Sequence, residues 1–414
     1  MKIYLESNGC TRRKSEISTF YNYFILNGYE VVAKPDEADH ILISTCAFKK
    51  AEEDYSVSRI RTLMEYKADL LVYGCLPDIA PNKYREFSDV SHVAPKNIEE
   101  IDSHFENIDV KFSEVKDSNV ISDHINYSSM PTAIKKFKNE FEFSSQFISR
   151  AMSYAEKRLR KIFSPDKKYF YLFICRGCLG NCSYCAIKRS IGTIKSKPIE
   201  KIMNEFREGV DSGYHDFIIL GDDVGGYGRD TDTTVSELLS RLINEMQELS
   251  SNNGSRLKGA EDMGFHIEEI HPRWVLLQEE MFLDLIASKK IKSILCPIQS
   301  GSNRLLKSMN RYHTAEGISD FFRKARALYP DMKLSTHLLV GYPSETDEEF
   351  GKSLSFLGQV RFDDVTIFPY DEKENTQSAG VNPKVPEDVI QRRVQEAYKF
   401  LREQKIKAFL SCPS

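Results

Sequence analysis

The chain has 414 residues, which is more than one ordinary core holds and enough for two domains. Hydrophobic residues make up 41% and charged residues 29% of the sequence, and no apolar run reaches the length of a membrane span. The N-terminus lacks the pattern of an export signal, so we expect a cytoplasmic protein with no membrane partner. The net charge of −4 excludes a protein that attracts nucleic acid through its overall charge, although a local basic patch is compatible with it.

The first 99 residues contain four strand-like segments that alternate with helical patterns, namely KIYLES, YEVVA, HILISTC and DLLVYGC. This alternation predicts a small doubly wound parallel sheet. Cysteine ends two of these segments, at Cys46 and Cys75, and Cys10 follows the first segment by a few residues. Because ligands bind at the carboxyl ends of the strands in such sheets, we expect these three thiols to converge there.

Residues 100–167 interrupt this rhythm and predict a connector with a basic helix from about residue 134 to 163. Residues 168–380 then contain six strand-like segments, YFYLFIC, HDFIILGDD, FHIEEIHP, KSILCPIQS, KLSTHLLVG and DVTIFPYD, and helical sequence follows each of the first five. This pattern fits a partial (β/α)6 barrel with its chemistry at the carboxyl ends of the strands. The predicted fold class is therefore α/β, with the small doubly wound domain before the partial barrel and a charged helix in residues 381–414.

The phrase CRGCLGNCSYC places Cys178, Cys182 and Cys185 in the spacing C-x3-C-x2-C after the first barrel segment. Thiolates are the usual ligands of iron–sulfur clusters, and three of them on a 4Fe–4S cluster leave one iron open. That iron can chelate S-adenosyl-L-methionine, whose reductive cleavage gives a 5′-deoxyadenosyl radical. A structural zinc site with Cys175 as fourth ligand is the alternative. The spacing favours the cluster, and Cys175, at the end of a strand, is expected to be a core thiol.

Several phrases resemble the methylthiotransferase family of radical S-adenosylmethionine enzymes. They are NGC, ADHILISTCAFKKAEE, VYGCLP, GCLGNCSYCAIKRSIGTIKSKP, LGDDVGGYGRD, PIQSGSNRLLKSMNRYHT, VGYPSETDEEF and FPYDEKENT, and apart from the connector they cover Met1 to about Ala379. The resemblance implies that Cys10, Cys46 and Cys75 hold a second, auxiliary 4Fe–4S cluster; buried packing thiols are the alternative. It also implies insertion of a methylthio group into an unactivated C–H bond of a transfer RNA base or a ribosomal protein side chain.

Residues at the ends of the barrel segments are candidates for cofactor contacts. A carboxylate there can accept a hydrogen bond from the cofactor's ammonium group, a glycine lets the backbone approach adenine, and an aromatic ring can stack on the base. Turn, capping and core roles are the alternatives. The candidate cofactor-binding residues are Asp222, Asp223, Gln299, Ser300, Gly341, Phe368 and Tyr370.

The sequence departs from the family's pattern in three ways. TRRKSE follows Cys10 where the family has an asparagine, His337 stands where it usually has aspartate, and DEKEN replaces a loop richer in proline and glycine. We expect His337 to be catalytic, binding a substrate carboxylate or moving a proton; a barrel-core histidine is the alternative. Members that act on transfer RNA usually continue into a small RNA-binding β-barrel domain, which we do not expect after the last barrel segment here.

These features predict an enzyme with two 4Fe–4S clusters and S-adenosyl-L-methionine that inserts sulfur or a methylthio group into a peptide or protein substrate. Transfer RNA is the alternative substrate, and the electron is expected from an external flavodoxin or ferredoxin. One competing hypothesis is a two-cluster enzyme that crosslinks, epimerises or oxidises a peptide. Another is a non-enzymatic iron–sulfur or zinc protein. The basic segment from Ile134 to Lys168 predicts a solvated helix face or a docking surface for an acidic leader peptide or RNA.

Overall fold

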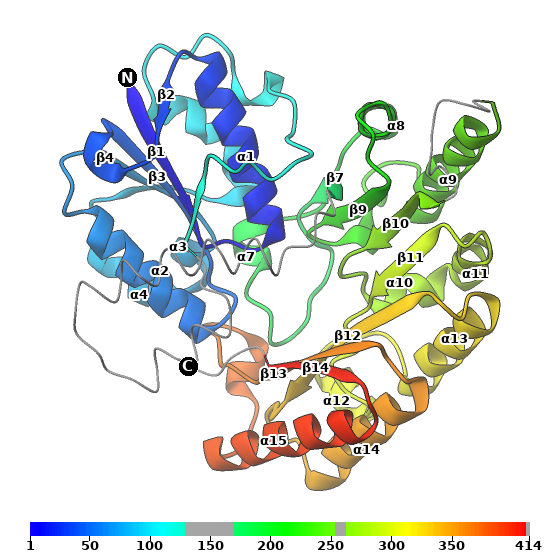
Figure 1. Ribbon diagram of the computed structural model, residues 1–414. Helices are drawn as coiled ribbons and strands as arrows, with labels where there is room; N and C mark the ends of the chain where they lie inside the picture. Colours follow the sequence, from blue (N-terminus) through cyan, green and yellow to red (C-terminus); the bar gives the residue numbers. More distant parts are fainter. Residues whose placement is uncertain (129–168, 253–261, 411–414) are drawn as a thin grey trace.

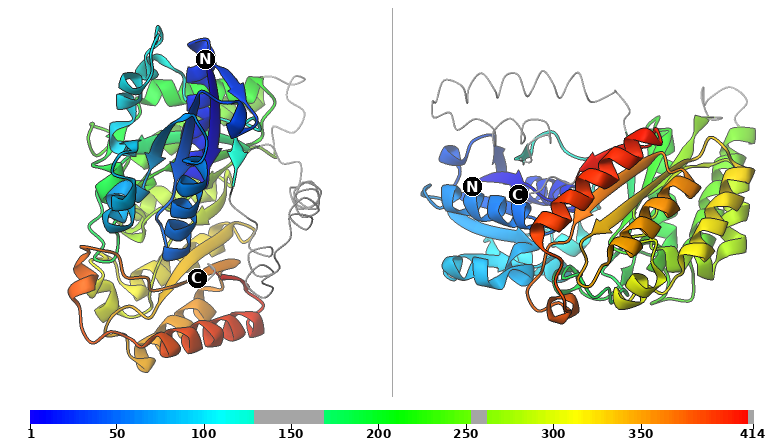
Figure 2. Two further views of the ribbon diagram at one scale, coloured as in Figure 1. Left: turned by 90° about the vertical axis from the view of Figure 1, so that its left-hand side faces the viewer. Right: turned by 90° about the horizontal axis from the view of Figure 1, so that it is seen from below.

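The computed structural model describes residues 1–128, 169–252 and 262–410. They form two α/β units, each built on a parallel sheet, that lie side by side (Figures 1 and 2). The predicted basic helix at residues 134–163 lies outside the described residues. Within the described parts of the chain, no helix is both long and apolar enough to cross a membrane.

The first unit is a six-stranded sheet with helices on both faces. Its strands are β1 (Lys2–Ser7), β2 (Glu30–Val32), β3 (His40–Thr45), β4 (Asp69–Gly74), β5 (Ser91–Val93) and β6 (Asn126–Tyr127). Its α-helices are α1 (Thr11–Leu26), α2 (Lys50–Leu63), α3 (Leu76–Ile79) and α4 (Pro81–Tyr84), and its 3-10 helices are η1 (Pro35–Glu37), η2 (Arg85–Phe87), η3 (Pro95–His104) and η4 (Phe112–Glu114). The strand order is β2-β1-β3-β4-β5, with β6 also paired to β1, and all pairings are parallel.

Two separate apolar clusters cover the two faces of this first sheet. One contains Phe20 of α1 and the other contains Ile60 of α2. The doubly wound prediction is therefore confirmed. In this strand order the topology switches between β1 and β3, which is where ligands bind in such folds, and Cys10 and Cys46 follow these two strands.

The described part of the predicted connector packs onto the first unit. Phe112, Val115 and Ile125 are buried in the same apolar cluster as Phe20, and β6 pairs with β1. The first unit therefore extends to about residue 127, beyond the predicted boundary at residue 99, because these apolar side chains complete its core.

The second unit is an eight-stranded open sheet. Its strands are β7 (Tyr169–Arg176), β8 (Lys195–Ser196), β9 (Asp216–Gly221), β10 (Gly264–Ile267), β11 (Ile291–Leu295), β12 (Lys333–Val340), β13 (Asp364–Pro369) and β14 (Lys407–Leu410), in the order β14-β13-β12-β11-β10-β9-β7-β8. Only β8, among these, is antiparallel to its neighbour. The six predicted barrel strands are all present.

Most helices of the second unit cover the outer face of its sheet, away from the first unit (Figure 1). The α-helices are α7 (Lys188–Ile191), α8 (Ile199–Asp211), α9 (Val235–Asn252), α10 (Pro272–Leu277), α11 (Glu279–Ala287), α12 (Asn303–Ser308), α13 (Ala315–Leu328), α14 (Asp347–Val360) and α15 (Glu387–Glu403), and the 3-10 helices are η5 (Val224–Gly226) and η7 (Gln377–Gly380). The short helix α7 instead contacts α3 and η3 of the first unit. One large apolar cluster fills the space between strands and helices. The inner face of the sheet is thereby left to the first unit, as the partial-barrel prediction requires.

The predicted C-terminal helix needs one correction. Helix α15 ends at Glu403, and the chain then forms strand β14, which pairs in parallel with β13. Lys405 has a φ of 59°, which interrupts the helix and turns the backbone toward the sheet edge. The sequence suggested helix throughout because four residues of strand are too few to show an alternating pattern.

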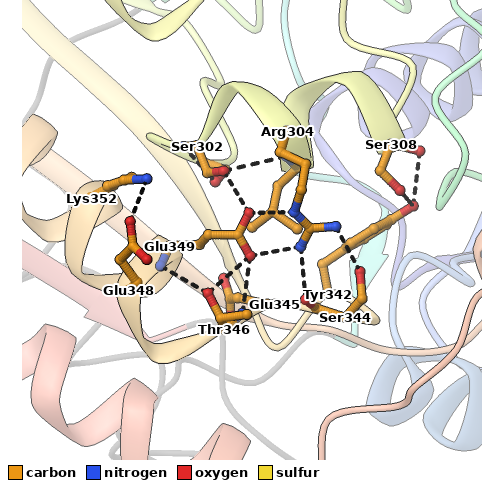
Figure 3. Close-up of polar contacts among 12 residues, drawn as sticks. Ser302, Arg304, Ser308, Tyr342, Ser344, Glu345, Thr346, Glu348, Glu349 and Lys352 are labelled. Atoms are coloured by element: carbon orange, nitrogen blue, oxygen red, sulfur yellow. Dashed lines mark hydrogen bonds and ion pairs between the residues drawn. The ribbon is translucent and has the colours of Figure 1, made fainter.

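A carboxylate joins the loops that follow β11 and β12. Glu349 of α14 accepts hydrogen bonds from Ser302 Oγ (2.9 Å) and from Nε and Nη2 of Arg304 (2.6 Å each), as Figure 3 shows. Burial opposes ionisation, but hydrogen bonds from Arg304, Thr346 and Ser302 lower the pKa of Glu349 to about 2. This contact fixes α12 against the start of α14 and holds the two loops in register.

We predict that Gly341→Ala destabilises the second unit. Gly341 has a φ of 84°, and a Cβ atom there would lie 2.4 Å from Cγ1 of Ile390 in α15. The expected loss in the free energy of unfolding is about 1–3 kcal/mol, measured by urea denaturation. Gly351→Ala is the matched control, because no atom lies within 4 Å of the added Cβ in α14 and the helix should gain up to about 1 kcal/mol. Equal effects of the two substitutions would contradict this account.

Candidate active site between the two sheets

A cavity of about 730 Å³ lies between the two units at the carboxyl ends of the second unit's strands. Cys178, Cys182 and Cys185 line it on one side. Residues 47–51, which follow Cys46, line it on the other side. Both of the cysteine-bearing regions predicted from the sequence therefore border the same space.

The loop after β7 directs hydrogen-bond donors at its own cysteines. The Gly180 N–H donates to Cys178 Sγ (3.1 Å), and the Leu179 N–H donates to Asp223 Oδ2 (3.1 Å). Burial raises the pKa of the Cys178 thiol above its ordinary range. This thiol therefore carries a proton at neutral pH and releases it when a metal binds.

Arg311 brings a positive charge to the same thiols. Its side chain is 6% exposed, and Nη1 lies 3.7 Å from Cys182 Sγ and 3.3 Å from the Tyr184 hydroxyl. Nη2 donates to the carbonyl oxygen of Pro297. A guanidinium and a backbone N–H aimed at the sulfurs of two of the three thiols suit an anionic iron–sulfur cluster. Among the described residues, no three His, Cys, Asp or Glu side chains are arranged to hold a single metal ion.

Cys10, Cys46 and Cys75 follow the carboxyl ends of β1, β3 and β4. Burial is the main reason why the pKa of Cys46 is raised, and the nearby thiols of Cys10 and Cys75 raise it further. Burial also raises the pKa of Cys75 to about 12, with Cys10 adding to the effect. The structure thus places these three thiols close enough to affect one another's ionisation.

Small residues hold this second triplet together. Gly74 has a φ of 114°, and a Cβ atom there would lie 2.5 Å from the Thr45 carbonyl oxygen, so glycine lets the ends of β3 and β4 meet. Ser56 of α2 donates its hydroxyl to the Cys46 carbonyl (2.8 Å) and accepts from the Asn8 side chain (2.8 Å). The loops that carry Cys10 and Cys46 are therefore pinned to one serine.

Asp222 and Asp223 line the cavity, but protein groups already occupy their oxygens. Asp222 Oδ1 accepts from Nη2 of Arg13 (2.8 Å), and Oδ2 accepts from the Gly177 N–H (2.9 Å). Asp223 Oδ1 accepts from the Trp274 indole (2.8 Å), and Oδ2 accepts from the cysteine loop. Both carboxylates thereby fix the surroundings of Cys178, and their expected contact with the cofactor's ammonium group stays a prediction.

Three other candidates differ in where they point. Gln299 and Gly341 line the cavity, and Gln299 has a φ of 71°. Ser300 is not part of this lining: it is buried, its hydroxyl accepts from the Ser302 N–H (3.1 Å), and it is hydrogen-bonded to Ser353 of α14 (3.2 Å). The expected cofactor role of Ser300 is therefore replaced by a structural one, because its side chain turns toward α14.

His337, Phe368 and Tyr370 form an aromatic wall of the cavity. The ring centroids of His337 and Phe368 are 4.9 Å apart, and Phe368 also meets Phe48 of the first unit at 5.4 Å. The Tyr370 hydroxyl donates to Ser378 Oγ (2.9 Å). These rings therefore join the two units across the cavity.

His337 faces charged groups from both units. Burial lowers its pKa, Glu269 partly offsets this, and Arg12 and Arg311 lower it further. Arg12 Nη1 donates to Glu269 Oε2 (2.7 Å). The imidazole is therefore neutral at physiological pH and can both donate and accept a hydrogen bond.

Several residues of the site were not predicted. Arg12 and Arg13 belong to the segment TRRKSE and Lys373 belongs to DEKEN, and the partners of these side chains could not be predicted from local patterns. Lys373 pairs with Glu53 of α2 and, at 2.8 Å, with Asp371. Two of the three departures from the family's pattern thus form contacts between the two units.

Both units match sequence models of known protein families. The sequence model of the Radical SAM superfamily matches residues 172–357, and the model described as Uncharacterized protein family UPF0004 matches residues 2–94. The ribosomal protein uS12 methylthiotransferase RimO of Geotalea uraniireducens is 31% identical over 407 residues, which cover 97% of this chain and 80% of that protein. A probable threonylcarbamoyladenosine tRNA methylthiotransferase of Pyrococcus horikoshii is 26% identical over 384 residues, covering 92% of this chain and 79% of that protein.

Solved structures share the fold at low sequence identity. TsrM, a radical S-adenosylmethionine methyltransferase from Kitasatospora setae, superposes with a TM-score of 0.58 and 11% identity, covering 91% of this chain and 76% of that chain. OxsB, a cobalamin-dependent S-adenosylmethionine radical enzyme, gives a TM-score of 0.55 and 13% identity, covering 97% of this chain and 56% of that chain. These likenesses confirm the α/β fold class.

We predict that His313, which lies two residues after Arg311, makes the free energy of unfolding depend on pH. It is 8% exposed, and burial together with Arg311 lowers its pKa to about 3. In the unfolded chain His313 becomes protonated below about pH 6.5, whereas in the folded chain it stays neutral at these pH values. Its contribution to the free energy of unfolding is therefore present above about pH 6.5 and is lost as the pH falls. Between pH 7.5 and 5.5 the loss should be about 1.4 kcal/mol.

The test of this pH dependence is urea denaturation of the wild type and His313→Gln at both pH values. The substitution removes the titrating group, so the wild type should lose more stability on acidification than the variant does. Identical losses in the two proteins would show that His313 does not carry the effect.

Proposed function

Because this chain belongs to the radical S-adenosylmethionine methylthiotransferase family, we propose that it replaces a hydrogen on an unactivated carbon with sulfur or a methylthio group. The observation that carries this proposal is a cavity bordered by Cys178, Cys182 and Cys185 of the second unit and by residues 47–51 of the first unit, which directly follow Cys46. A carbon-centred radical formed in such a space meets its sulfur donor without diffusion, which favours transfer over side reactions.

Cys178, Cys182 and Cys185 are the ligands we assign to a 4Fe–4S cluster that binds S-adenosyl-L-methionine. Cys10, Cys46 and Cys75 are the ligands we assign to an auxiliary cluster. When bound, these groups supply the radical that removes the hydrogen atom and the sulfur that replaces it. Overall, a C–H bond would break and a C–S bond would form. The hydrogen would leave in 5′-deoxyadenosine, with methionine as the other product of the first S-adenosyl-L-methionine, and a second one would give its methyl group and leave as S-adenosylhomocysteine. The electron that a flavodoxin or ferredoxin supplies for the cleavage would be released again to the cluster when the C–S bond forms.

The chain's own residues prepare the site for this reaction. Arg311 and the Gly180 N–H stabilise negative charge on the cysteine sulfurs. Asp223 anchors the loop between Cys178 and Cys182. We assign to the neutral His337, on the aromatic wall, a hydrogen bond that orients the substrate. Among the remaining candidates, we assign cofactor contacts to Gln299, Gly341, Phe368 and Tyr370, which all line the cavity.

We favour a peptide or protein substrate over transfer RNA. Relatives named for ribosomal protein uS12 are 26 to 31% identical, and relatives named for transfer RNA are 26 to 27% identical, so identity favours the peptide only slightly. Binding of an RNA backbone needs uncompensated positive charge. The basic side chains that line the cavity are Lys49, Lys50, Arg311, Lys373 and Lys384, and the acidic ones are Asp222, Asp223, Glu269, Asp371, Glu372 and Glu387. This lining has no excess of positive charge, which suits a peptide better.

The cluster assignment predicts iron contents. The reconstituted wild type should hold about eight iron atoms per chain. Cys178→Ala should lose about four of them together with the formation of 5′-deoxyadenosine, whereas Cys10→Ala should lose about four and still cleave S-adenosyl-L-methionine. Cys296→Ala is the matched control, since Cys296 is a fully buried thiol among the apolar side chains of the core, and it should keep all the iron. Unchanged iron in Cys10→Ala would refute the auxiliary cluster.

The substrate assignment predicts a mass change. Mass spectrometry of peptides and transfer RNA incubated with the reconstituted enzyme should show a gain of sulfur or a methylthio group on a peptide. His337→Ala should lower the product yield about tenfold or more while 5′-deoxyadenosine still forms, because the hydrogen bond we assign to this residue orients the substrate. A product on transfer RNA alone would overturn the peptide assignment. Loss of hydrogens without gain of sulfur would instead support crosslinking or oxidation.

A further inference from the structure

We propose that Asp222 is a positioning residue that holds the two cysteine triplets at a fixed separation. The proposal rests on the proposed function, because a fixed separation matters only if both triplets serve one reaction. Asp222 touches structure belonging to both cysteine regions at once, and this direct bridge carries the inference.

The two oxygens of Asp222 reach in different directions. Oδ1 accepts from Arg13 Nη2 at 2.8 Å and lies 3.5 Å from Arg12 Nε. These arginines are in the first turn of α1, which Cys10 caps at its N-terminus. Oδ2 accepts at 2.9 Å from the N–H of Gly177, the residue before Cys178. One carboxylate therefore links the helix that starts at Cys10 to the loop that starts at Cys178.

The bridge is buried and its partners are themselves fixed. The side chains of Arg13 and Asp222 are 2% and 3% exposed. Arg13 also pairs with Glu16 at 2.7 Å, so it cannot follow Asp222 without breaking a second buried contact. Removing one member of a buried pair leaves a charge without its partner, and water cannot enter readily to replace it. The link therefore resists small changes in geometry.

A second contact, between apolar side chains, also connects the two cysteine-bearing regions. Ala186 and Ile187, which follow Cys185, pack in the first unit's apolar cluster with Leu76 and Cys75. The chain after the third thiol of one triplet thus lies against the chain around the third thiol of the other. This contact keeps the units together when Asp222 is replaced, so that substitution should loosen the bridge without separating the units.

Glu53 offers a matched comparison. It is a buried carboxylate of the first unit that pairs with Lys83 (2.9 Å) and with Lys373 of the second unit. Like Asp222 it joins the two units through a basic side chain, but none of its contacts lies next to a cysteine. Glu53→Gln therefore tests the loss of an interdomain ion pair without the loss of the cysteine bridge.

The experiment compares the reconstituted holoenzymes of the wild type, Asp222→Asn, Asp222→Ala and Glu53→Gln. Amide hydrogen exchange is measured in segments 9–16 and 176–186, together with the iron content and the ratio of sulfur-containing product to 5′-deoxyadenosine. Asp222→Asn keeps the shape and one acceptor for Gly177, so it guards against a loss of folding in Asp222→Ala. We expect exchange to rise in both segments in the Asp222 variants and in neither segment in Glu53→Gln. The product ratio should fall about tenfold to 100-fold with the iron retained.

Three results separate the possible failures. Unchanged exchange in either segment of both Asp222 variants would overturn the positioning role. A parallel loss of product and of 5′-deoxyadenosine with unchanged exchange would show instead that Asp222 contacts the cofactor directly, and would also overturn it. Absence of any sulfur-containing product from the wild type would refute the proposed function, while the exchange measurement would still decide whether Asp222 joins the two loops.

Discussion

The arrangement of this molecule depends on a buried network of charges between its two sheets. Arg13 and Glu16 of α1 pair with each other at 2.7 Å, and each also reaches the second unit, Arg13 through Asp222 and Glu16 through Arg176 Nε at 3.1 Å. Because these charges are buried, a change in the relative position of the units costs free energy, since it separates a buried charge from a partner. The network therefore fixes the position of one sheet relative to the other, and this position determines the shape of the cavity between them.

The fixed position of the two units matters for the proposed chemistry. A carbon-centred radical must be protected from water and from other hydrogen donors, and a space walled by both units gives this protection better than an open sheet edge does. Phe48 from the first unit and Phe368 from the second close the same wall. If the proposed function holds, the ion pairs between the units are part of the catalytic apparatus, although they touch no reacting atom.

Local patterns in the sequence predicted the two sheets and the places of the cysteines. Strand periodicity is local, and a cysteine directly after a strand falls at the carboxyl edge in whichever order the strands pair, as Cys46 and Cys75 do. The partners of charged side chains are not local. Arg13 and Asp222 are 209 residues apart, and their pairing depends on how the two sheets face each other. For the same reason Asp222 seemed a free carboxylate in the sequence.

The direction in which loop side chains point also could not be predicted from the sequence. Gln299 and Ser300 are neighbours after β11, but one lines the cavity and the other hydrogen-bonds to α14. The loop backbone decides this, through a positive φ at Gln299 that no residue pattern revealed. Gly341 was expected to let the backbone approach adenine, and the structure shows that it also makes room for Ile390. A glycine indicates close approach without saying what approaches.

We propose that two iron–sulfur clusters lie beside one cavity and that only one of them binds S-adenosyl-L-methionine. The decisive measurement is electron paramagnetic resonance of the dithionite-reduced holoenzyme, recorded before and after addition of that cofactor. We expect signals from two clusters, a change of one of them on addition of the cofactor, and loss of that same signal in Cys182→Ser. A single cluster signal, or two signals that the cofactor leaves unchanged, would contradict it.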